Sequence, residues 1–136
     1  MRDDEKFVVI LIAVVLVASI VVEVLFLLSW YRCFSKMRPE NREMEPGLVW
    51  LNLIPIFNLG WTFYVVAKFA NSIKKELGTD AGDGGWALGL AYAILMVTGL
   101  IPGIGAFLGI AGLVVWVIYW IKISDFSKRL GAPAAP

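Results

Sequence analysis

Residues 51–61 read LNLIPIFNLGW, an apolar stretch that also contains two asparagines, a proline and a glycine. Pro55 has no amide hydrogen, so a helix through this stretch would leave the carbonyl of Leu51 without its usual donor and would bend. Membrane helices tolerate such a bend where neighbouring protein groups satisfy the freed carbonyl. The stretch therefore predicts a kinked membrane-spanning helix over about residues 48–72, with Asn52 and Asn58 facing protein.

The composition of the whole chain also indicates a membrane protein. Apolar and aromatic residues make up 60% of the 136 residues and charged residues 17%, whereas an ordinary soluble domain has about 25% charged residues. This length corresponds to a single domain, and the apolar runs occupy most of it. The chain has no room for a separate soluble catalytic domain.

Further apolar runs complete the expected fold. The run Phe7–Ser29 has 23 residues with one charge, and as a helix it is about 34 Å long, which exceeds a hydrocarbon core of about 30 Å. The runs at 86–101 and 104–123 are separated only by Pro102 and Gly103, a dipeptide typical of a turn. We expect an all-α integral membrane protein, a single transmembrane domain over 1–136. Its four helices, at about 7–30, 48–72, 86–101 and 104–123, would form two hairpins, the second helix being kinked at Pro55.

Two alternatives remain open for these runs. The run at 86–101 has only 16 residues, so the last two helices form a re-entrant hairpin in the alternative interpretation. The first run is also N-terminal, as a cleaved signal peptide would be. Against cleavage, it is longer than the usual 7 to 15 apolar residues, and no small-residue cleavage site follows it.

The distribution of lysine and arginine predicts the orientation. With four spans, both termini and the 74–85 loop share one side of the membrane, which then has eight basic residues against four on the other. Basic residues favour the cytoplasmic side, so we expect cytoplasmic termini. The tail at 131–136, GAPAAP, is expected to be extended.

Two blocks carry a resemblance to a known family. They are EPGLVWLNLIPIFNLGWTFYVVAKFANSIKKEL (45–77) and WALGLAYAILMVTGLIPGIGAFLGIAGLVVWVIYWIKISDFSKRL (86–130), with PGLVWLNLIPIFNLGW and YWIKI as the sharpest motifs. These blocks resemble an uncharacterised family of small bacterial four-helix membrane proteins, in which similar segments stand alone or are fused to GYF-like soluble domains. The resemblance implies a multi-pass protein of the bacterial inner membrane and implies no known activity.

The residues offer little chemistry. The chain has no histidine, one cysteine (Cys33) and no nucleotide-binding or nucleophile motif. We therefore expect no enzymatic activity, no metal and no cofactor, but bound lipids. We expect no nucleic-acid partner and identify no soluble small-molecule substrate. Cys33 is expected to be inert, with palmitoylation or redox sensing as alternatives.

Glu23 is the main candidate for function, because an ionisable residue inside a membrane is usually a functional residue. On an antiparallel second helix its depth corresponds to Pro55, which predicts an intramembrane polar cluster of Glu23, Asn52, Pro55 and Asn58. A protonated Glu23 would there donate a hydrogen bond to an asparagine or to the Leu51 carbonyl. An ion or proton pathway and a contact with a partner subunit are the alternatives.

Small and aromatic residues define two further sets. Small residues at helical spacing predict a face for close packing, either within the bundle or against a partner. This face comprises Gly89, Ala93, Gly105, Gly109 and Gly112. Aromatic and basic residues near the ends of the spans predict interfacial anchors. These are Trp30, Trp86, Trp116, Trp120, Lys68 and Lys122.

Two functions fit these patterns. The favoured hypothesis is a non-catalytic accessory or assembly subunit that packs against a larger membrane protein complex, because close-packing faces are abundant and chemistry is scarce. The alternative is a small oligomeric channel or transporter that uses Glu23 and the broken second helix. A pore would need polar residues along one face, whereas Glu23, Asn52 and Asn58 are expected at one depth.

Overall fold

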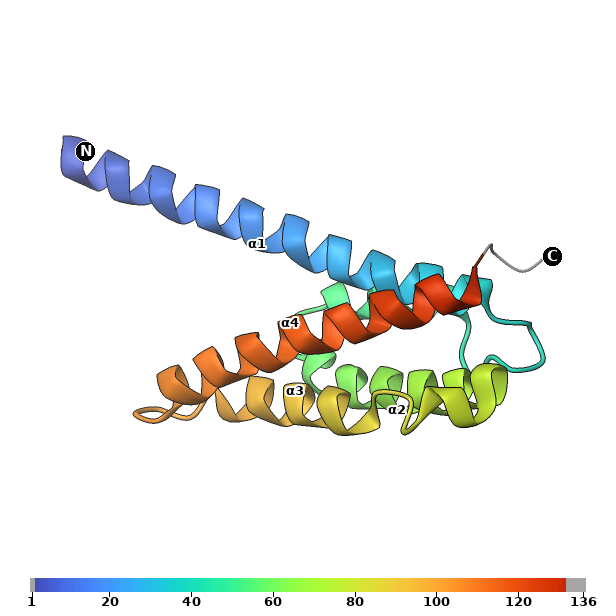
Figure 1. Ribbon diagram of the computed structural model, residues 1–136. Helices are drawn as coiled ribbons and strands as arrows, with labels where there is room; N and C mark the ends of the chain where they lie inside the picture. The colour runs from blue at the N-terminus through green and yellow to red at the C-terminus, as the bar shows by residue number, and fades with distance from the viewer. Residues whose placement is uncertain (1, 132–136) are drawn as a thin grey trace.

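Helices account for nearly all of the regular structure in residues 2–131, which are the residues that the computed structural model describes (Figure 1). The α-helices are α1 (Asp3–Lys36), α2 (Phe57–Leu77), α3 (Trp86–Thr98) and α4 (Gly105–Leu130), and the 3₁₀-helices are η1 (Pro46–Leu53) and η2 (Gly78–Ala81). The all-α prediction is confirmed for this part of the chain. Apart from Gly131, the tail expected to be extended lies outside it.

Two helices, α1 and α4, are long and apolar enough to cross a membrane. Their most apolar 18 residues have mean hydropathies of 3.2 and 2.0. By contrast, α3 has 13 residues and is only about 20 Å long.

The stretch LNLIPIFNLGW forms a turn and not a kinked helix. The residue before a proline is driven to extended backbone, and Ile54 accordingly has φ −80° and ψ 115°, which ends η1. Ile56 has φ 68°, and the Phe57 amide donates to the Pro55 carbonyl at 2.7 Å, closing a γ-turn. The Leu51 carbonyl accepts from the Ile54 amide at 3.1 Å, so it is not freed. The predicted helix over 48–72 is therefore wrong in its first part, and α2 begins after the turn.

Helices α1 and α4 run in the same direction. The Trp120 indole donates to Ser29 Oγ at 2.7 Å, and Lys36 Nζ donates to Ser127 Oγ at 2.9 Å. Both pairs are separated by 91 residues. Because this offset is constant over two turns of helix, the two helices run in the same direction where they touch, and the start of α4 corresponds in register to about residue 14 of α1.

Helix α2 also runs parallel to α1. The rings of Phe34 and Phe69 lie 5.5 Å apart, and just beyond the end of α1 Arg38 pairs with Glu76, near the end of α2, at 3.5 Å. Among the four α-helices of the described residues, α3 runs in the opposite direction to the other three (Figure 1). The antiparallel pairing predicted for the first two helices is therefore wrong, because residues 37–56 return as a loop, η1 and a turn.

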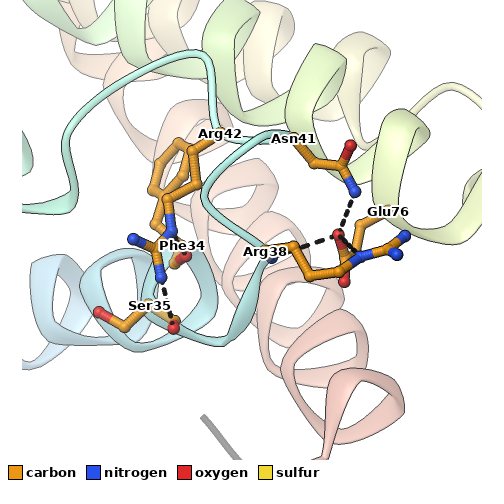
Figure 2. Close-up of polar contacts among 6 residues, drawn as sticks. All are labelled: Phe34, Ser35, Arg38, Asn41, Arg42 and Glu76. Carbon is orange, nitrogen blue, oxygen red and sulfur yellow. Dashed lines mark hydrogen bonds and ion pairs between the residues drawn. The ribbon is translucent and has the colours of Figure 1, made fainter. Parts of the chain in front are cut away.

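The loop after α1 is fastened to two helix ends (Figure 2). Arg42 donates from Nε to the Phe34 carbonyl and from Nη2 to the Ser35 carbonyl, each at 2.8 Å, and so caps α1. Across the loop, Glu76 accepts from Asn41 at 2.5 Å and pairs with Arg38. We call residues 32–45, 68–83 and 122–131 the polar end. The four-span prediction places residues 40 and 80 on opposite sides of the membrane, but here they share this end.

Aromatic side chains form the core where α1 meets α3 and α4. Trp30 is 1% exposed, and its indole donates to the hydroxyl of the fully buried Tyr119 at 3.3 Å. Phe26 packs against Trp30, Tyr92 and Trp116, with ring centroids 4.7, 5.9 and 5.5 Å away. Trp30 therefore faces the core, whereas an interfacial anchor would face lipid.

Candidate functional site

Helix α1 divides into a packed half and a free half. Its buried residues all lie in the second half: Phe26, Leu27, Trp30, Cys33 and Phe34. None of the residues in its most apolar stretch of 18 is buried. The first half of α1 diverges from the other helices (Figure 1). We call the space between residues 15–23 of α1 and the α3–α4 pair the fork.

The fork holds a pocket of about 420 Å³. Its lining residues come from α1, α3 and α4: Val15, Ala18, Ser19, Val22, Glu23, Tyr92, Met96, Leu113 and Trp116. The α1 members recur every three or four residues, so they share one helix face. The same spacing continues through the buried residues of α1. The residues of α1 that line the fork and those that pack in the core therefore form one continuous stripe along the helix.

Glu23 is half-buried at the narrow end of the fork and also lines a second, smaller pocket. That pocket includes Asn58, Thr62 and Tyr92. Among residues 2–131, no side chain forms a hydrogen bond or ion pair with the Glu23 carboxyl, although Tyr92 lines the same two pockets. Glu23 is thus an acidic residue without a hydrogen-bond or ion-pair partner on an apolar helix. This makes it the strongest candidate for a functional residue in the described part of the chain.

The predicted polar cluster forms only in part. Glu23 and Asn58 line the same pocket, but Asn52 is held elsewhere. The Asn52 amide donates to the Val49 carbonyl at 3.0 Å and accepts from Thr62 Oγ1 at 3.0 Å. Asn52 thus fixes η1 to α2. Pro55 stands in the exposed turn, away from both pockets.

Thr62 and Tyr92 are site residues that the sequence analysis missed. The single Thr62 hydroxyl hydrogen is shared between Asn52 and the Asn58 carbonyl, which lies 2.7 Å from Oγ1, one turn earlier on α2. The i, i+4 spacing of Asn58 and Thr62 could have suggested this neighbour. No sequence pattern could have suggested that Tyr92 lies near Glu23, because this placement depends on how α3 packs against α1.

Most of the predicted small-residue face packs inside the chain. A Cβ atom on Gly89 would lie 2.5 Å from Val66 Cγ1, and one on Gly112 would lie 3.2 Å from Leu95 Cβ. A Cβ on Gly105 would meet the Gly99 carbonyl, and Ala93 is buried. Gly109 differs, since a Cβ there would have no atom within 4 Å.

The predicted anchors other than Trp30 lie nearer the surface. Trp86 is exposed, while Trp116 and Trp120 are half-buried against the aromatic core. Lys68 pairs with Glu43 at 3.7 Å, and Lys122 lies over the Phe126 ring at 5.9 Å. Both lysines belong to the polar end.

The single cysteine, Cys33, lies in the core. The thiol of Cys33 is fully buried, so neither an acyl chain nor an oxidant reaches it in this conformation. Residues 2–131 contain no group of three or more histidine, cysteine or acidic side chains that could hold a metal ion.

Comparisons of the chain with protein-family models, curated proteins and solved structures found no match, so the family resemblance stays a prediction.

Proposed function

We propose that the chain is a non-catalytic accessory subunit of a larger membrane protein complex, and that a helix of another subunit occupies the fork. The observation that carries this proposal is the stripe on α1. Its packed part contributes to the core, and its free part, Val15 to Glu23, lines a pocket but contains no buried residue.

Membrane insertion of α1 is the first step of the proposal. From Phe7 to Tyr31 the helix has 25 residues with one charge, a length of about 37 Å against a hydrocarbon core of about 30 Å. The helix continues without a break into the core residues, which favours a retained anchor over a cleaved signal peptide. The bacterial inner membrane is the location that the resemblance implies.

The character of the two faces of α1 favours a protein in the fork over lipid alone. The fork face combines Val15 and Val22 with small and polar residues, Ala18, Ser19 and Glu23. The opposite face has large aliphatic residues: Ile10, Val14, Val17, Val21 and Leu25. Helices associate in membranes through small residues and interhelical hydrogen bonds, whereas large aliphatic side chains are equally well solvated by lipid tails.

Glu23 supplies the chemistry of recognition. A carboxyl group without a partner is costly in hydrocarbon, and a hydrogen-bond donor on the incoming helix would remove that cost. A lysine, arginine, serine or threonine at the same depth would serve. We therefore expect the partner helix to place such a donor opposite Glu23.

Site-specific photo-crosslinking in native membranes tests the proposal. A photoreactive residue at Val15 or Ser19 should crosslink to a second protein, which mass spectrometry would identify. The same residue at Val17 or Val21, on the opposite face, is the matched control and should crosslink only to lipid. Equal protein crosslinking from both faces, or none from either, would contradict docking in the fork.

The channel or transporter remains a second candidate because of one observation. Glu23 and Tyr92 line both pockets, and the second pocket adds Asn58 and Thr62, so polar groups from three helices gather near Glu23. A proton or ion flux through reconstituted vesicles that depends on Glu23 would favour this candidate over the accessory subunit.

A further inference from the structure

Charged residues divide the chain into segments with a simple relation to the fold. No charged residue occurs in 46–67 or in 84–121, and the polar end comprises the segments around them. The turn at Pro55–Ile56 lies at the middle of the first uncharged segment, and the turn at Pro102–Gly103 lies at the middle of the second. Each segment is therefore a hairpin that begins and ends at the polar end and has its tip at the farthest point from it.

Both tips are apolar and exposed. Ile56 is 83% exposed and Leu100 is 67% exposed. Other large apolar side chains accompany them: Leu53, Ile54, Phe57, Ile101, Ile104 and Phe107. A turn that emerges into water between two spanning helices is normally polar, so these tips are suited to hydrocarbon.

Each hairpin has one arm that is too short to cross a bilayer, although α4 as a whole is long enough. The uncharged part of α2, Phe57–Ala67, is about 16 Å long, and α3 is about 20 Å long. The uncharged part of α4, Gly105–Ile121, is about 25 Å long, and the hydrocarbon core is about 30 Å thick. With the polar end at one surface, neither tip reaches the other surface.

From this geometry we infer that α1 is the one segment of the described chain that crosses the bilayer completely, and that the acyl chains of the bilayer surround the two tips. The hairpins η1–α2 and α3–α4 enter and leave on the same side. This inference does not depend on a partner in the fork.

Basic residues give the orientation. Ten lysines and arginines belong to the polar end, and two, Arg2 and Lys6, lie at the start of α1. The positive-inside rule then puts the polar end on the cytoplasmic side and the start of α1 on the opposite side. The expectation that both termini are cytoplasmic is replaced, because it counted a crossing for each apolar run.

The backbone groups at the two tips are suited to hydrocarbon, because many of them are paired within the turns or absent. Pro55 and Pro102 each remove an amide donor at the turn. In the second turn the Ile101 amide donates to the Thr98 carbonyl at 3.0 Å, and the Gly105 amide donates to the Ile101 carbonyl at 2.8 Å. Such internal pairing lowers the cost of placing a turn in hydrocarbon.

Cysteine labelling in sealed membrane vesicles tests the inference. In a Cys33→Ala background, single cysteines replace Asp4, Glu40, Asp80, Ile56 and Ile101, all of them exposed side chains. A membrane-impermeant maleimide should label positions 40 and 80 from one side and position 4 from the other. Positions 56 and 101 should label from neither side until detergent is added, which also shows that these variants are reactive.

Three results would overturn the inference. Labelling of 56 or 101 from the side opposite to 40 would mean that the hairpin crosses. Labelling of either tip from the same side as 40 would mean that it is not embedded. Labelling of position 4 from the same side as 40 would mean that α1 does not cross. If the labelling fits and no crosslink forms from Ser19, the topology stands and the accessory-subunit proposal fails.

Discussion

Lys75 Nζ lies 2.6 Å from a carboxylate oxygen of Glu43, joining the loop after α1 to the last turns of α2. Asn71 and Lys68 contact the same carboxylate, at 3.3 and 3.7 Å. The Glu43 side chain thus contacts three residues of α2. These contacts help to keep the loop after α1 beside the C-terminal end of α2.

The Glu43 contacts predict an acid-dependent loss of stability. The hydrogen bond from Lys75, with help from Asn71 and Lys68, lowers the pKa of Glu43 in the folded protein. Its stabilisation is therefore complete above the unfolded-state pKa of about 4.3 and is lost as the pH falls through the lower folded-state pKa. We expect Glu43→Gln to cost up to about 1 kcal/mol at pH 7 and nothing near pH 2, by thermal unfolding in detergent. A cost that is independent of pH would contradict this.

Asp83 predicts a second effect, at the start of α3. Its two carboxylate oxygens accept from the Ala87 amide at 3.0 Å and the Gly85 amide at 2.9 Å, and these bonds, with that to Ala87 foremost, lower its pKa. Loss of such a cap costs about 1 kcal/mol, so Asp83→Ala should lower the melting temperature at neutral pH. Asp83→Asn keeps the acceptor and should be milder. Equal losses in both variants would show that the bonds to the amides are not the cause.

The positive φ of Ile56 predicts that replacing this residue with glycine relieves backbone strain. At φ 68° a β-branched residue is strained by about 1–2 kcal/mol, and glycine is not. Glycine loses about 0.5–1 kcal/mol through backbone entropy, so Ile56→Gly should be neutral or stabilising by about 1 kcal/mol. Ile54→Gly, at φ −80°, is the matched control and should destabilise. Chemical unfolding in detergent measures both, and equal destabilisation would argue against strain at Ile56.

The glycines of α3 and α4 predict opposite effects of alanine. A Cβ on Gly89 would lie 2.5 Å from Val66 and 3.0 Å from Tyr119, so Gly89→Ala should cost about 1–3 kcal/mol. Gly109 has open space, and alanine there gains helix propensity of up to about 1 kcal/mol. Melting temperatures of the two variants should move in opposite directions. A loss at Gly109 comparable to that at Gly89 would mean that another chain already packs against it.

Glu23 separates the two proposed functions. For an accessory subunit, Glu23→Gln keeps a donor and should be nearly silent, while Glu23→Leu should weaken co-purification with the partner; membrane polar contacts are worth about 0.6 kcal/mol on average. For a proton pathway the Gln variant, which cannot ionise, should abolish flux in vesicles. Flux lost with unchanged thermal stability would reject the structural role of Glu23.

The sequence was sufficient for some features and not for others. The apolar runs predicted α1 and α4 because length and hydropathy are local properties. The same residues around Pro55 are compatible with a kinked helix and with a turn, and nothing local reveals the positive φ of Ile56. An earlier indication was present in the charges, since both turns lie at the middle of an uncharged segment. The Glu23–Asn58 neighbourhood was predicted in part, but Asn52 is held by Thr62, a contact that depends on how η1 packs.

The parallel register of α1 and α4 also constrains the order of assembly. Ser29 and Trp120 are 91 residues apart, and α1 is made first and α4 last. Phe26 and Trp30 of α1 therefore lack their α4 neighbours, Trp116 and Tyr119, until α4 has been made, whereas Phe34 can already pack against Phe69 of α2. Contacts between distant segments form slowly, and exposed apolar surface in such intermediates promotes misassembly. We therefore expect truncation within α4 to leave Phe26 and Trp30 of α1 uncovered and the shortened chain prone to aggregation.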